Sequence, residues 1–167
     1  MAEITAGAVG ELQSAIKGRV SQPGEAGYGE AVNIWNASAA ALRRPALVAS
    51  CTSSADVVAA LAFARQQGLE VSVRGGGHNY AGFALCDDGL MIDLTPMKQV
   101  IVDPDARRAR CGGGTTWGEL DAMTQGHGLA VPGGFISHTG VAGLTLGGGI
   151  GWLSRLAGLS CDNLVGA

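Results

Sequence analysis

Three glycine triplets constrain the fold of this chain more strongly than any other feature of its sequence. They occupy residues 75–77, 112–114 and 147–149, and the 167 residues include 28 glycines in all. Glycine has no Cβ atom, so it permits backbone conformations and close approaches that side chains forbid, although it weakens helices and strands. Average usage of about 7% would give far fewer glycines, and no internal repeat explains the triplets. Parts of this fold therefore require bare backbone.

Charge and hydropathy exclude two broad classes of partner. With 11 basic and 14 acidic residues and no lysine or arginine cluster, the chain lacks the basic stripe that nucleic acid requires. No apolar run approaches the roughly 20 residues of a membrane span, and the first 20 residues do not resemble a signal peptide. We expect no nucleic acid partner, no membrane partner and a cytoplasmic location.

The four cysteines predict neither a metal site nor a disulfide framework. Cys51, Cys86, Cys111 and Cys161 lie far apart and form no C-x-x-C pair. We expect them to be reduced and mostly buried as small apolar side chains, with no metal bound.

The first half of the chain alternates between helical and extended patterns. Two helices, a buried strand, a third helix and a second strand are expected in that order at residues 8–20, 28–36, 46–49, 53–68 and 70–74. Ser53 caps the third helix and Gly68 ends it. The order strand, helix, strand predicts a βαβ-like unit whose second strand ends at the glycine triplet 75–77.

The second half of the chain predicts a strand meander followed by a helix and a glycine-rich segment. Strands are expected at residues 90–94, 99–102 and 107–111, and a helix at 117–125 with Thr116 and Glu119 as its capping box. The segment after Val131 is too apolar for a linker, which favours a binding loop. The predicted fold class is α+β, with two small α/β lobes at about residues 1–88 and 89–167.

The loop after the strand 70–74 is the first candidate site. Consecutive glycines let successive N–H groups point into one concavity that can hold a pyrophosphate, and Arg74 could neutralise part of its charge. A plain tight turn explains a lone triplet equally well. His78 favours a site, because an imidazole beside a nucleotide loop can be a nucleophile, a hydrogen-bond donor or a packed ring. His127, between two glycines, is more simply a turn residue.

The segment 132–151 is the second candidate site. Its glycines, apolar residues and hydroxyls fit backbone that lies along an elongated ligand carrying phosphates. A P-loop is excluded because no glycine run ends in Gly-Lys-Ser/Thr, and a Rossmann fingerprint is excluded because the run 147–151 comes too late in the chain.

Together, the two segments resemble the PCMH-type FAD-binding domain of the vanillyl-alcohol oxidase superfamily. The resemblance is to its berberine-bridge-enzyme-like and 6-hydroxynicotine-oxidase-like flavoproteins, and Tyr28, Trp35-Asn36 and the run Cys161-Asp162-Asn163-Leu164 also fit. It implies FAD between the two lobes, with its pyrophosphate on the loop 74–79 and a bond from the His78 ring to the 8α-methyl carbon of the flavin. The residues expected to contact FAD are Arg74, Gly75, Gly76, Gly77, His78, Asn79, Ala81, Gly82, Gly133, Ser137, Thr139, Gly140, Val141, Gly143, Leu146, Gly147, Gly148, Gly149 and Gly151.

The chain departs from the family pattern at two points. Some relatives carry a second covalent link from a cysteine, and Ile136 stands at the aligned position, so we expect a single bond. Relatives also continue for several hundred residues into a substrate-binding domain, which this chain lacks. A small-molecule substrate would bind in that missing part.

The resemblance implies an oxidoreductase that transfers hydride from a C–H bond of an alcohol, sugar or amine to flavin, with oxygen as acceptor. No general base can be named, because Asp87, Asp88 and Asp103 to Asp105 fall in predicted turns where carboxylates are solvated. Two alternatives stay open: a non-catalytic nucleotide-binding module, and an inactive fragment that associates with itself through an exposed apolar face.

Overall fold

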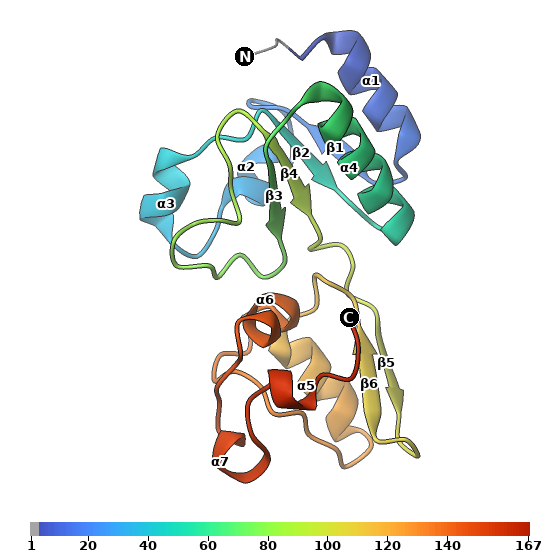
Figure 1. Cartoon of the computed structure of the whole chain (residues 1–167), viewed down its shortest axis with the longest axis vertical. Helices are drawn as coiled ribbons and strands as arrows, with labels where there is room; N and C mark the ends of the chain where they lie inside the picture. Colours follow the sequence, from blue (N-terminus) through green and yellow to red (C-terminus); the bar gives the residue numbers. More distant parts are fainter. Residues whose placement is uncertain (1–3) are drawn as a thin grey trace. The chain divides into compact units, whose positions relative to one another are not determined.

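The computed structural model describes residues 4–167, and the chain divides into two compact units (Figure 1). Unit 1 extends to Pro96, and unit 2 comprises Met97–Ala167. The fold is α+β, with a four-stranded sheet in unit 1 and a two-stranded sheet in unit 2. The boundary lies later in the chain than the expected 88–89, because the strand after residue 89 completes the sheet of unit 1.

The sheet of unit 1 confirms the βαβ-like unit and adds a strand inside it. In sheet order, its strands are β1 (Arg19–Ser21), β2 (Leu47–Ser50), β4 (Leu90–Asp93) and β3 (Val71–Arg74). Strands β2 and β3 both pair in parallel with β4, whereas β1 is antiparallel. The prediction that residues 90–94 begin a meander is wrong. All four β4 residues are buried, as is typical of a central parallel strand.

Helix α4 (Ser54–Gln67) joins β2 to β3, and its ends are those that the sequence predicts. Ser53 Oγ accepts from the backbone N–H of Asp56 at 3.3 Å, and Gly68 ends the helix at a φ of +65°. Helix α1 (Ala6–Ala15) is shorter than the predicted 8–20, because the chain turns at Gly18 to form β1. A Cβ at Gly18 would lie 1.9 Å from the carbonyl oxygen of Ser50.

The helix predicted over residues 28–36 ends early, at Val32. Helix α2 (Tyr28–Val32) ends before an extended segment, and α3 (Ala37–Leu42) begins after it. The Asn36 side chain caps α3 by accepting from the N–H groups of Ser38 and Ala39. This cap explains the break, because an N-cap residue has a non-helical backbone.

One cluster of the core of unit 1 lies between α2 and one face of the sheet. It consists of Tyr28, Ala31, Val32, Ile34, Val48, Ala84, Leu85 and Met91. The Tyr28 hydroxyl donates to the Pro45 carbonyl at 2.7 Å, so the first residue of α2 is fixed by a buried hydrogen bond.

Unit 2 consists of a hairpin, one longer helix and short helices. Strands β5 (Val100–Asp103) and β6 (Arg108–Cys111) are antiparallel, as predicted, and precede α5 (Trp117–Gln125). The predicted capping box of Thr116 and Glu119 is present. Helices α6 (Val141–Leu146) and α7 (Ser154–Ala157) and the 3-10 turn η1 (Cys161–Asn163) follow. Trp117, Leu120 and Val141 form the core.

All four cysteines are free thiols. Cys51 and Cys86 are buried, Cys111 is half-buried and Cys161 is exposed. Within residues 4–167, no three histidine, cysteine, aspartate or glutamate side chains are grouped to hold a metal. Over the same residues, no helix combines the length and apolar character needed to cross a membrane.

Candidate functional site

The glycine loop of unit 1 leaves the sheet at the carboxyl end of β3. Residues 75–79 follow Arg74 without helix or strand, and Gly77 has a φ of +71°. A side chain at Gly77 would be strained by that angle, and its Cβ would lie 3.3 Å from Arg74 Nε and 3.5 Å from Ile34 Cγ2. Glycine is therefore required at this position by the protein itself, whether or not a ligand binds.

The guanidinium of Arg74 contacts the end of α2. It donates to the backbone carbonyls of Glu30, Ala31 and Asn33, whose carbonyl groups form the C-terminal end of that helix. Its Nε is buried without a hydrogen-bond partner among the described residues. These contacts leave Arg74 less free to bind a phosphate than the sequence suggests, and they join the base of the loop to α2.

The segment between α2 and α3 lies along the glycine loop. The backbone N–H of Trp35 donates to the Gly77 carbonyl at 3.1 Å, and Asn36 Nδ2 donates to the Tyr80 carbonyl at 2.7 Å. The Trp35 and His78 rings are stacked, with centroids 5.7 Å apart and planes at 21°. Unlike His78, Trp35 and Asn36 had no expected role beyond their fit to the family resemblance. The one local signal was an asparagine suited to capping a helix.

The end of the loop is a hydrogen-bonded turn. Asn79 Oδ1 accepts from the Phe83 N–H at 3.0 Å, and the Gly82 carbonyl accepts from Arg43 Nη1 at 2.8 Å. Gly82 has a φ of +76° and a Cβ there would lie 2.4 Å from that of Ala39. Of the residues predicted here, Asn79 and Ala81 are exposed, whereas Gly82 is buried.

The second predicted segment, residues 132–151 of unit 2, lies beside the start of α5. The Ser137 carbonyl accepts from the N–H of Gly118 at 2.8 Å, and the Thr139 carbonyl accepts from that of Trp117 at 3.0 Å. The N–H of Val141 donates to the Thr115 carbonyl at 2.9 Å. The segment is thus held to the body of unit 2, and it includes α6 where the sequence predicts a loop.

Three predicted glycines of unit 2 are explained by packing. A Cβ at Gly133 would lie 2.3 Å from the Trp117 ring, and one at Gly149 would lie 2.4 Å from Ser160 Oγ. A Cβ at Gly151 would lie 1.5 Å from the Gly133 carbonyl oxygen. These positions require glycine in the absence of any ligand.

Other predicted glycines have no such explanation. No atom lies within 4 Å of a Cβ built at Gly143, and Gly147 meets nothing closer than 3.4 Å. Both are exposed, as is Leu146 between them at 73%. Helix α6 therefore presents bare backbone to the outside, which is the arrangement that allows a flat ligand to approach closely.

A cavity of about 640 Å³ lies in unit 2 next to α6. Val141 and Leu146 line it, together with Gly112 and Gly113 of the second glycine triplet. The volume is in the range of ligand sites, about 300–1,000 Å³. The cavity is therefore large enough for a small ligand.

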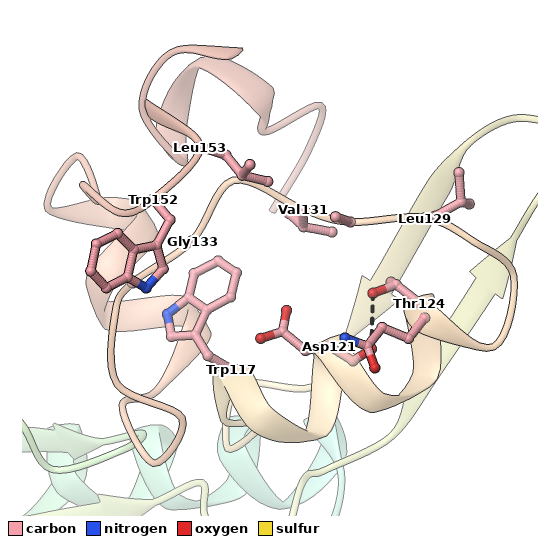
Figure 2. A pocket seen from close by; sticks show the side chains of 11 residues that line it. Trp117, Asp121, Thr124, Leu129, Val131, Gly133, Trp152 and Leu153 are labelled. Atoms are coloured by element: carbon pink, nitrogen blue, oxygen red, sulfur yellow. Dashed lines mark hydrogen bonds between the residues drawn. The ribbon is translucent and has the colours of Figure 1, made fainter. Parts of the chain in front are cut away.

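A second, smaller cavity of unit 2 is lined mainly by α5 and the segments 129–134 and 152–153 (Figure 2). Its volume is about 190 Å³, and the rings of Trp117 and Trp152 and the carboxylate of Asp121 border it. Burial raises the pKa of the Asp121 carboxyl. Gly133 is the sole predicted site residue here, and helical spacing of Trp117, Asp121 and Gln125 was the only sequence signal.

Of the carboxylates that the sequence predicts in turns, Asp105 lies in a turn and Asp87 and Asp88 lie in a bend, whereas Asp103 is the last residue of β5. Asp87 accepts from the Arg44 N–H at 3.0 Å, and Asp103 accepts from the Ala106 N–H at 2.9 Å. Asp87, Asp88, Asp103 and Asp105 are all exposed. None of these carboxylates is a distinct candidate for a general base.

Comparisons with known proteins agree on one family. The profile described as "FAD binding domain" matches residues 45–167. The chain is 41% identical over 152 residues to (R)-6-hydroxynicotine oxidase of Paenarthrobacter nicotinovorans, covering 91% of this chain and 33% of that protein. It is 39% identical over 150 residues to an uncharacterized FAD-linked oxidoreductase of Bacillus subtilis, covering 90% and 33%.

Solved structures show the same likeness. The crystal structure of 6-hydroxy-D-nicotine oxidase from Arthrobacter nicotinovorans has a TM-score of 0.84 at 40% identity and covers 88% of this chain and 32% of its own. The chain spans about a third of the length of the relatives that it matches.

Proposed function

The chain belongs to the family of FAD binding domains, and from this premise we propose that it binds FAD as the cofactor-binding part of a flavin-dependent oxidoreductase. The observation that carries the proposal is the bare, exposed backbone at Gly143 in α6 and at Gly147 directly after it, which packing does not explain. A cofactor that needs close backbone approach explains it.

The loop of residues 75–79 is proposed to hold the pyrophosphate. Backbone N–H groups of successive glycines suit phosphate oxygens, and they carry no side chains that would keep the ligand away. Arg74 contributes indirectly, because its guanidinium is bound to the carbonyls at the end of α2. The predicted contacts of unit 2 from Ser137 to Gly148 are also proposed to bind FAD.

His78 is proposed to form a single covalent bond with the cofactor. The bond would join a ring nitrogen of His78 to the 8α carbon and replace one N–H and one C–H bond. The two protons and two electrons released would reduce the flavin ring, and molecular oxygen would take them up as hydrogen peroxide. Ile136 is half-exposed and has no thiol, which is consistent with one link rather than two.

When bound, FAD would accept hydride from a C–H bond of an alcohol, sugar or amine and pass the electrons to oxygen. The chain's own groups bind and orient the cofactor. Because the chain spans a third of its relatives, the substrate pocket and the base of the complete enzyme would come from outside residues 1–167.

Absorption spectroscopy of the purified chain tests the proposal. A flavin band that remains with the protein after gel filtration is the expected result, and protein without flavin after incubation with excess FAD would contradict it. Hydrogen peroxide release with alcohols, sugars or amines separates an enzyme from a binding module. Elution as a dimer or larger species would indicate self-association through exposed side chains such as Trp152 and Leu156, at 82% and 85%.

A further inference from the structure

The indole of Trp35 is stacked on the imidazole of His78 although its side chain is largely exposed. Trp35 is 60% exposed, and it does not belong to the core cluster that contains its neighbour Ile34. The ring planes are inclined by 21° with centroids 5.7 Å apart, an offset stack. An exposed tryptophan loses conformational freedom in such a fixed contact, so the contact calls for an explanation.

Backbone contacts on both sides of the stack set this geometry. The N–H of Trp35 donates to the carbonyl of Gly77, the residue before His78, at 3.1 Å. Asn36 donates to the carbonyl of Tyr80 at 2.7 Å, and the buried side chain of Ile34 lies against Gly77. The segment 34–36 is therefore attached to the loop both before and after His78.

We propose that Trp35 is a positioning residue that holds the His78 imidazole for bond formation with FAD. A stacked indole covers one face of the imidazole and opposes rotation of the ring, whereas the ring nitrogens lie on the edge of the imidazole, which the indole does not cover. The bond formed is the one between ring nitrogen and 8α carbon described above, with the same electron balance. This inference rests on the proposed function. Trp35 lies outside residues 45–167 that the family profile matches.

The test is the rate of covalent incorporation when the cofactor-free chain is mixed with FAD. Trp35→Leu is expected to slow the appearance of protein-bound flavin after acid precipitation by about fivefold, the effect of losing one aromatic pair. Trp35→Phe retains a stacking face and should incorporate FAD within about twofold of the wild-type rate. Reversible FAD affinity, measured before the bond forms, should change little in either variant. Leu42→Ala, an exposed apolar truncation in unit 1, is the matched control.

Proton NMR of the cofactor-free chain gives a second readout. The chain has three histidines, so His78→Ala identifies the His78 ring resonances by their loss. A stacked indole shifts these resonances upfield. They should move downfield in Trp35→Leu and much less in Trp35→Phe.

The two proposals fail in different ways. Incorporation of FAD by Trp35→Leu at the wild-type rate overturns the role of Trp35 and leaves the covalent bond intact. Unmoved His78 resonances in Trp35→Leu also overturn it. A wild-type chain that binds FAD but never attaches it overturns both the covalent bond and the role assigned to Trp35, while FAD binding itself stands.

Discussion

Alanine substitutions at Gly143 and Gly149 test whether a glycine is needed for ligand binding or for packing within the protein. A Cβ at Gly143 meets no protein atom within 4 Å. Because alanine is the better helix former, Gly143→Ala should raise the free energy of unfolding by about 0.5–1 kcal/mol. The added methyl group would occupy the space that the cofactor needs, so FAD affinity should fall by about tenfold, or about 1.4 kcal/mol.

Gly149→Ala should lower the free energy of unfolding, whereas Gly143→Ala should raise it. Its Cβ would lie 2.4 Å from Ser160 Oγ and 2.5 Å from Leu144 Cδ2, at a φ of +77°. The left-handed backbone costs a side chain about 1–2 kcal/mol, and overpacking adds about 1–3 kcal/mol. The cofactor-free variant should therefore lose about 3 kcal/mol of stability.

Urea denaturation of the cofactor-free variants and FAD titration by flavin fluorescence measure the two effects separately. Wild-type FAD affinity in Gly143→Ala, at unchanged or higher stability, would refute the view that α6 is bare for the sake of the cofactor. A destabilised Gly143→Ala would show that the space around it is not open.

Three further predictions concern unit 1 and the helix caps. Burial alone would raise the pKa of the Asp56 carboxyl, but hydrogen bonds chiefly from Thr52 and Lys17 hold it well below its usual range. Asp56→Asn should therefore lower the free energy of unfolding, measured by urea denaturation at pH 7, by about 3 kcal/mol. The difference in stability from the wild type should narrow as the pH falls below about 4, because wild-type Asp56 then loses its stabilising contribution. Burial, with smaller contributions from Asp56 and a second aspartate, raises the pKa of Cys51 to about 11, so a maleimide at pH 7 should label exposed Cys161 first and Cys51 only after unfolding. Thr116→Ala should lower the free energy of unfolding by about 1 kcal/mol in the same urea assay, because it removes the capping box of α5.

Elements whose ends are set by local hydrogen bonds could be predicted from the sequence. The α4 helix begins after Ser53 and ends at Gly68, and the capping box of α5 is formed by Thr116 and Glu119. In each case the signal and its partner lie within a few residues of one another. Parallel pairing has no such local signal, and β4 was therefore assigned to the wrong sheet.

The sequence predicts which segments form the candidate site, but it does not predict how their residues pack. Glycine runs mark both segments, but the sequence does not distinguish Gly143, which is open, from Gly151, which packs against Gly133. That difference depends on residues far away in the chain. The same holds for Arg74 and Trp35, whose partners become evident only when the break between α2 and α3 is seen.

Mass spectrometry of the peptide that contains His78, taken from acid-denatured protein loaded with FAD, tests the central claim most directly. The account predicts a yellow precipitate and a peptide carrying one flavin on His78, and His78→Ala should give a colourless precipitate although it still binds FAD reversibly. A colourless wild-type precipitate, or a flavin attached to another residue, would contradict it.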